Sequence, residues 1–243
     1  MALTIAVSAA SSAPTTDPLT GQLIEITDEH GRTKTVRIDA VEIDSKDPEG
    51  DTYLYSVSVQ TLINGNWHNL CQADREGVAK AIALTGHWEA SGRHVDSARI
   101  TLACTSGVLA KCVRWGYKPW QMQHGRSLRP LHQACTRMAR ADYCGDGRIH
   151  TREGTPINVV DVLGVQQHAS VSGMDFEAAW GPDGALALAR GRFTDAEAII
   201  AECPYRLGGR RHIGVARPSL DTLRQQYPNA LLFNESHPVI TSP

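Results

Sequence analysis

The sequence predicts an α+β protein in which an antiparallel sheet, built from N-terminal strands and a late hairpin, packs against a central helix-loop-helix that disulfides stabilise. Three observations support this fold class: β-branched segments separated by polar turns in the first hundred residues, a helical stripe of apolar residues mid-chain, and six cysteines. We expect a single domain over residues 21–236, β-rich over 21–104, helix-rich over 105–165 and mixed over 166–236. Residues 1–20 are expected to be a leader or signal remnant, and 237–243 a tail.

The N-terminal strands are predicted from residue type and alternation. Two β-branched segments flank the polar residues 28–32, which indicates a hairpin, and Asn64-Gly65 is typical of a second hairpin turn. Residues 44–50 are predicted to be a polar loop. The expected strands are Gln22–Ile26, Thr35–Ile43, Tyr53–Val59, Asn66–Leu70, Ala79–Leu84, Gly86–Trp88 and Ala98–Cys104.

Helices are expected in the middle of the chain. Thr105-Ser-Gly107 predicts a turn before a short helix over Val108–Trp115. The central helix, Ser127–Ala141, carries an inward apolar stripe. We interpret Arg137 and Arg140, on its remaining circumference, as surface charges; the alternative is that they bind an anionic group near the end of the helix. Thr155-Pro156 is typical of a helix start, so we expect a second helix from Pro156 to Leu163.

The last third of the chain is predicted to mix strands and helices. Gly181–Gly184 lies between two apolar segments and predicts a hairpin that extends the first sheet. Thr194 begins a capping box for a helix to Glu202, and Ser219 caps a helix that runs to Tyr227. Leu231–Phe233 is expected to anchor the C-terminal end.

The cysteines predict a disulfide framework. In a helix, Cys135 and Cys144 would lie about 13 Å apart along the axis, too far for the Cα separation of about 5.5 Å in a disulfide. We therefore expect the central helix to be tied to the Cys104/Cys112 region and to Cys203. An even cysteine count without a Cys-x-x-Cys pair favours a secreted or periplasmic protein over a zinc ribbon. The alternative is six buried free thiols in a cytosolic protein.

Charge and hydropathy argue against nucleic acid as a partner and against a membrane-spanning helix. A net charge of −2, with 21% charged residues, provides no electrostatic basis for binding nucleic acid. No apolar run approaches the roughly 20 residues of a membrane-spanning helix. Short local motifs of common enzymes, such as a Gly-x-Ser-x-Gly elbow or a phosphate-binding loop, are absent from the sequence.

The segment 142–153 combines acids, turn glycines and possible ligands. Read as a calcium loop, it places Asp142 at position 1, Asp146 at position 5, the backbone carbonyl of Arg148 at position 7 and Glu153 at position 12. The departure is Cys144 at position 3, where calcium requires an oxygen. The alternative is a structural turn that ends the central helix.

The same segment also predicts a catalytic site. Cys144 would be a thiolate nucleophile, His150 or His132 its base, and Asp142 or Asp161 the group that orients the imidazole, with Tyr143 as a further candidate. A disulfide at Cys144 would remove the thiolate. An Asp142/Asp146 carboxylate pair is another possible source of acid and base chemistry.

These residues also carry a family resemblance. Ala141-Asp-Tyr-Cys144, the following Gly-Asp-Gly and His150–Thr155, together with Ala103–Cys112 and Trp115–Trp120 upstream, resemble the bacterial ADYC domain family. The similarity runs from about Gly21 to Asn234. It implies an exported protein and one compact unit, and it implies no reaction because the family is functionally uncharacterised.

Two functional hypotheses follow. The first is a secreted or envelope binding or interaction module, stabilised by disulfides and by calcium, that recognises an extracellular or envelope polymer or protein. The second is a hydrolase or transferase that acts on an extracellular polymer or peptide at the loop from Asp142 to His150.

Overall fold

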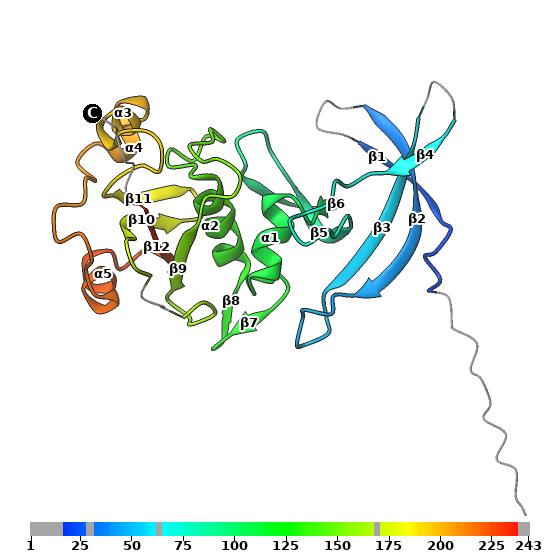
Figure 1. Cartoon of the computed structure of the whole chain (residues 1–243), viewed down its shortest axis with the longest axis horizontal. Helices are drawn as coiled ribbons and strands as arrows, with labels where there is room; N and C mark the ends of the chain where they lie inside the picture. The colour runs from blue at the N-terminus through cyan, green and yellow to red at the C-terminus, as the bar shows by residue number, and fades with distance from the viewer. Residues whose placement is uncertain (1–16, 28–31, 62–64, 168–170, 238–243) are drawn as a thin grey trace, which may run out of the picture.

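The computed structural model describes residues 17–27, 32–61, 65–167 and 171–237 and shows two sheets with two helices between them (Figure 1). Most of the predicted leader and tail, most of the turn at 28–32, and Asn64 lie outside the described residues.

The first sheet contains six strands and has the order β1-β2-β3-β5-β6, with β4 paired to β3. All of its pairs are antiparallel, and its strands confirm the seven predicted β segments, two of which, Ala79–Leu84 and Gly86–Trp88, form the single strand β5. The buried side of β3 combines Val57 and Val59 with Val36 and Ala81 in one core cluster. The bounds are β1 Leu23–Thr27, β2 Thr33–Ile43, β3 Tyr53–Gln60, β4 Trp67–Asn69, β5 Ala81–Trp88 and β6 His94–Cys104.

Two helices form the layer between the sheets. Helix α1 (Val108–Arg114) contacts β6 and α2 (Arg129–Arg140), which in turn packs on the second sheet (Figure 1). The predicted stripe of α2 is confirmed, because Leu131, Cys135 and Met138 are fully buried. A short ribbon of β7 (Met122–Gln123) and β8 (Arg126–Ser127) precedes α2.

The second sheet corrects two predictions. The late hairpin is confirmed as β10 (Asp175–Gly181) and β11 (Gly184–Leu188), but it does not extend the first sheet. It belongs to a separate sheet of order β11-β10-β12-β9, in which β12 is Leu232–Ser236. The helix predicted over Pro156–Leu163 is wrong, since Ile157–Asp161 is strand β9, paired antiparallel with β12. The sequence Ile-Asn-Val-Val is rich in β-branched residues, which favour a strand, and its partner β12 lies far away in the chain.

Three short helices lie in the C-terminal part: α3 (Ala196–Glu202), α4 (Pro204–Leu207) and α5 (Leu220–Gln226). Ser219 caps α5 as predicted, accepting a hydrogen bond from the backbone N–H of Thr222. The cap of α3 is Asp195 rather than Thr194. Among the described residues, no helix has both the length and the apolar character needed to cross a membrane.

All six cysteines form disulfides: Cys71–Cys104, Cys112–Cys135 and Cys144–Cys203. Cys112–Cys135 joins α1 to α2, and Cys144–Cys203 joins the segment after α2 to the end of α3. Both predicted attachments of the central helix region are therefore confirmed.

Candidate functional site

The tetrapeptide Ala141–Cys144 ends α2 and is completely buried, or nearly so, at all four positions. Ala141 adopts the left-handed conformation, with φ 51° and ψ 43°, and is the C-cap of the helix. The backbone N–H of Asp142 then donates to the carbonyl of Arg137 at 2.9 Å. This pattern satisfies carbonyls that the end of a helix leaves without partners.

Asp142 is bound on both of its oxygens. Arg137 Nη1 donates to Oδ2 at 2.5 Å, and the backbone N–H groups of Asp146 and Gly147 donate to Oδ1 and Oδ2, each at 3.1 Å. The interpretation of Arg137 as a surface charge is wrong, because its side chain is 3% exposed and pairs with this carboxylate. Asp142 therefore organises the turn and compensates a buried guanidinium.

Tyr143 joins the turn to the second sheet. Its hydroxyl donates to Glu177 Oε1 at 3.0 Å and accepts from the backbone N–H of Arg192 at 3.1 Å. Its ring stacks on Trp180, with centroids 5.2 Å apart. Burial, followed by the nearby charge of Glu177, raises the pKa of Tyr143 well above its usual value, so the phenol stays protonated.

The structure corrects the thiolate hypothesis at Cys144. Its sulfur is bonded to Cys203 and cannot act as a nucleophile while the bridge is closed. His150 Nδ1 donates to the carbonyl of Ala141 at 3.1 Å, and its Nε2 lies 3.1 Å from Glu202 Oε2. His132, the alternative base, is buried and donates through Nε2 to the carbonyl of Leu109 at 3.1 Å.

The structure does not bring the proposed calcium ligands together. Asp142 is enclosed by its own turn, whereas Asp146 pairs with the side chain of Arg148, which also reaches Glu202. Glu153 is exposed and lies in the wall of a cavity. No group of ligand atoms within 4.8 Å of one another includes these residues in the described part of the chain.

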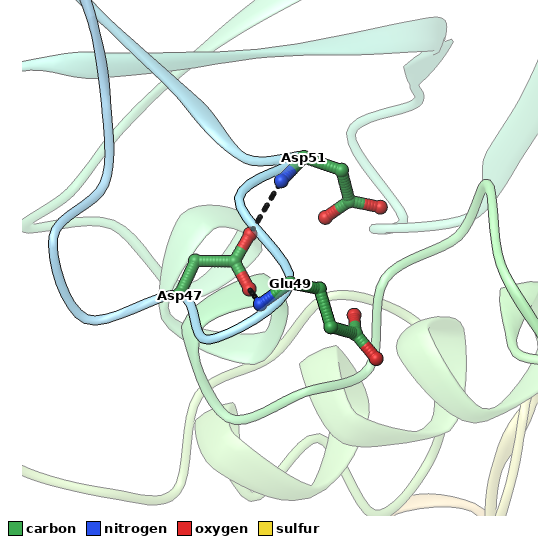
Figure 2. A group of neighbouring side chains, drawn as sticks. All are labelled: Asp47, Glu49 and Asp51. Atoms are coloured by element: carbon green, nitrogen blue, oxygen red, sulfur yellow. Dashed lines mark hydrogen bonds between the residues drawn. The ribbon is translucent and has the colours of Figure 1, made fainter.

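A different acidic group meets that distance criterion: Asp47, Glu49 and Asp51, on the loop between β2 and β3 (Figure 2). Asp47 organises the loop by accepting from the backbone N–H groups of Glu49 and Asp51, each at 3.1 Å. The ammonium Nζ of Lys118 lies 2.6, 2.7 and 2.5 Å from the three carboxylates in that order. By its chemistry the group could hold a metal ion, but only in place of this ammonium.

Lys118 joins the first sheet to the segment that precedes α2, and its side chain is 7% exposed. We expect Lys118→Met to lower the free energy of unfolding by about 3 kcal/mol, because it leaves buried charge uncompensated. The matched control is Lys46→Met, which removes an exposed pair with Glu76 and should cost less than about 1 kcal/mol. Urea denaturation measures both, and equal losses would contradict this role for Lys118.

The pH dependence follows from Asp47. Burial raises the pKa of Asp47, but hydrogen bonds from Lys118 and Thr52 outweigh it and hold the pKa well below 3.8. A lowered folded-state pKa gives stability that is complete above the unfolded-state value and is lost as the pH falls towards the folded-state value. The difference between wild type and Lys118→Met should therefore shrink progressively below pH 3.8.

A cavity of about 660 Å³ lies between the first sheet, α1 and the second half of the segment 142–153. Ile149 and the run from Thr151 to Thr155 line it. Arg75, from the segment between β4 and β5, reaches across to Gly154, where an added Cβ would lie only 1.8 Å from Arg75 Nη2. Glycine at position 154, with φ +85°, therefore leaves room for this guanidinium.

The charge in the cavity wall is unevenly compensated. Arg114 pairs with Asp44 at 2.8 Å and with Asp74 at 2.9 Å. Asp47 pairs with Lys118, and Glu76 with Lys46. Within the described residues, no ion pair joins the basic lining residues Arg75, Lys111, Arg140 and Arg152 to an acid, and the acid that stays unpaired in the wall is Glu153. The wall therefore has an excess of positive charge.

Sequence reasoning missed the ion pairs that shape this region. The spacing Asp47-x-Glu49-x-Asp51 was visible in a segment interpreted only as a polar loop. Its partner Lys118 lies 71 residues beyond Asp47. No local pattern connects residues at that separation.

The fold and its bridges define a disulfide-stabilised α+β protein with two antiparallel sheets and helices between them. A family model described as the ADYC domain matches residues 16–194, so the chain belongs to the ADYC domain family. Comparison with curated proteins and with solved structures finds no match. The family match ends at residue 194, before α3, whereas the resemblance in the sequence runs to about Asn234. Strand β12 comes after the matched range, although it lies between β10 and β9 in the second sheet.

Proposed function

We propose that the chain is a binding module that works outside the cytoplasm, and that the 660 Å³ cavity receives an anionic group of an extracellular or envelope polymer or protein. The proposal rests on the basic residues of the cavity wall that form no ion pair within the described part of the chain. Arg75, Lys111 and Arg152 come from three separate segments and line the same cavity, whose acids, apart from Glu153, are compensated by Arg114, Lys118 and Lys46.

The geometry of the wall suits an oxyanion. Arg152 lies over the ring of Phe193, with its guanidinium carbon 4.5 Å from the centroid, so its plane is oriented by the stack. A guanidinium fork pairs with carboxylate or phosphate in a bidentate manner, and an ammonium such as that of Lys111 adds a point charge. A ligand held by both Arg75 and Arg152 would contact the segment between β4 and β5 and the segment 142–153 at once.

The disulfides support a location outside the cytoplasm. Three closed bridges leave no free thiol among the cysteines. Such bridges persist in oxidising surroundings and are rare where thiols are kept reduced. A secreted or periplasmic location is therefore part of the proposal.

The binding proposal is favoured over the hydrolase or transferase alternative. Asp142, Tyr143 and Cys144 are held by partners within the fold, and none of them lines the cavity. Calcium, if the protein takes it, would have to compete with Lys118 at Asp47, Glu49 and Asp51, rather than bind in the predicted loop.

The test is anion binding by the wild type and two variants. The probes are a galacturonate hexamer, pentaphosphate and a glutamate hexapeptide, measured by calorimetry at low ionic strength. We expect at least one of them to bind, with Lys111→Gln/Arg152→Gln weakening the affinity about 10- to 100-fold through lost charge-assisted hydrogen bonds. The preferred probe distinguishes carboxylate from phosphate and polymer from peptide.

Arg148→Gln is the matched control, because Arg148 is a basic residue of the same loop that pairs with Asp146 and Glu202 and does not line the cavity. Its affinity should equal that of the wild type. Failure of all three probes to bind, or equal weakening in the control, would contradict the proposal.

A further inference from the structure

A second cavity, about 330 Å³, lies on the other side of the segment 118–120: Lys118 lines the larger cavity, whereas Pro119 and Trp120 line the smaller one. Its walls come from β5, the start of β6, the first turns of α2 and the turn between β10 and β11. The volume is at the lower end of the range of about 300–1,000 Å³ that is typical of small-molecule sites.

Aromatic and proline side chains form much of the wall of the smaller cavity. Trp88, His94, Trp120 and His132 line it, together with the prolines Pro119, Pro130 and Pro182. Trp88 and His94 pack with centroids 4.6 Å apart, and Trp88 meets His132 at 5.9 Å. Trp120 is 43% exposed. The site thus presents carbon surfaces that are already in place before a ligand arrives.

The ring N–H groups of this wall are already engaged. Trp88 Nε1 donates to Gln133 at 3.1 Å, and Trp120 Nε1 donates to Asp51 at 2.8 Å. His94 Nε2 donates to the carbonyl of Thr85 at 3.0 Å, and His132 Nε2 to that of Leu109. Burial lowers the pKa of His132 to about 4, so this ring is neutral at pH 7.

The charged lining residues supply further polar groups. Arg93 pairs with Glu89, and Arg129 pairs with Asp96. Asp183 is exposed, and no hydrogen bond or ion pair engages its carboxylate within the described part of the chain. A carboxylate accepts hydrogen bonds through both oxygens. The cavity therefore offers carbon surface to pack against and an acceptor for hydroxyl groups.

We propose that this cavity binds one pyranose ring of a neutral oligosaccharide. A pyranose has a C–H face that packs on indole and proline rings, and hydroxyls at its edge that can donate to Asp183. A proline-rich peptide fits less well, because both indole N–H groups, which would donate to its backbone carbonyls, are committed to Gln133 and Asp51. An anionic ligand would meet the carboxylate of Asp183 and two arginines that are already paired.

The test uses titration with maltohexaose, cellohexaose and chitotetraose, and with a proline decamer as the competing class, followed by tryptophan fluorescence and calorimetry. At least one oligosaccharide should bind, and Trp120→Ala should weaken its affinity about tenfold or more. Asp183→Ala should also weaken the affinity for the oligosaccharide. Because Asp183 lies on an exposed turn, this substitution leaves the rings in place. Trp67→Ala, which removes a tryptophan of β4 outside this cavity, should leave the affinity unchanged.

The outcome is independent of the larger cavity, because Lys111→Gln/Arg152→Gln should retain oligosaccharide binding. Binding of the proline decamer in place of the sugars would overturn the proposal. So would the absence of sugar binding, or sugar binding that neither Trp120→Ala nor Asp183→Ala weakens.

Discussion

Replacing Arg192 with methionine is expected to lower the free energy of unfolding by about 3–5 kcal/mol, because removing one partner leaves a buried charge uncompensated. The side chains of Arg192 and Glu177 are 1% and 0% exposed, and Arg192 Nε lies 3.0 and 2.9 Å from the two carboxylate oxygens. Arg192 Nη2 also donates to the carbonyl of Met138 at 2.6 Å, near the C-terminal end of α2. A cation at this end of a helix is favoured by the helix dipole.

The matched control is the double variant Glu177→Gln/Arg192→Met. Glutamine keeps an acceptor for the hydroxyl of Tyr143 and removes the stranded charge. The double variant should therefore be more stable than Arg192→Met alone, although still below wild type because the contact with Met138 is lost. Urea denaturation followed by circular dichroism gives the three free energies. A double variant as unstable as the single one would show that the buried charge is not the cause.

The same contacts explain why the tetrapeptide Ala141–Cys144 is a structural junction. Asp142 compensates Arg137, Tyr143 reaches Glu177 and Trp180, and Cys144 is bonded to Cys203. Asp142 thus holds the turn against α2, whereas Tyr143 and Cys144 connect the end of α2 to the second sheet and to the residue that follows α3. The thiolate chemistry predicted for this segment is wrong, because Cys144 is bonded to Cys203. Within the segment 142–153, the cavity is lined only from Ile149 onward.

Local signals in the sequence predicted much of the fold. The alternation over Tyr53–Val59 and the stripe on α2 depend on neighbours within one element, and both elements formed as expected. The disulfide argument also succeeded, because the length of α2 and of the segment after it is enough to exclude a Cys135–Cys144 bridge.

Distant pairing accounts for the errors. Ile157–Asp161 became a strand because β12, more than seventy residues later, supplies its hydrogen bonds. Arg137 is buried because Asp142, the carbonyls of Ser91 and Pro182, and the turn between β10 and β11 enclose it. The two cavities arise where segments from separate elements meet, and no periodicity along the chain reveals such a meeting.

Removing the Cys144–Cys203 bridge by Cys144→Ser/Cys203→Ser should lower the free energy of unfolding by about 4 kcal/mol. The two cysteines are 59 residues apart, so the bridge closes a long loop and restricts the unfolded chain strongly. It also attaches α3 to the end of α2, and α3, seven residues long, is too short to be stable alone. We therefore expect α3 and α4 to lose most of their hydrogen-exchange protection in this variant.

Cys71→Ser/Cys104→Ser is the control, since it removes a bridge that spans 33 residues within the first sheet. It should cost a similar free energy, because the entropy of loop closure changes slowly with loop length. Its loss of protection should fall on β4 and β6 and leave α3 unaffected. If instead α3 kept its full protection without the Cys144–Cys203 bridge, noncovalent packing of Ile199 and Leu207 on the main core would be sufficient to hold it. The tetrapeptide would then mark the end of α2 without fastening the C-terminal part to it.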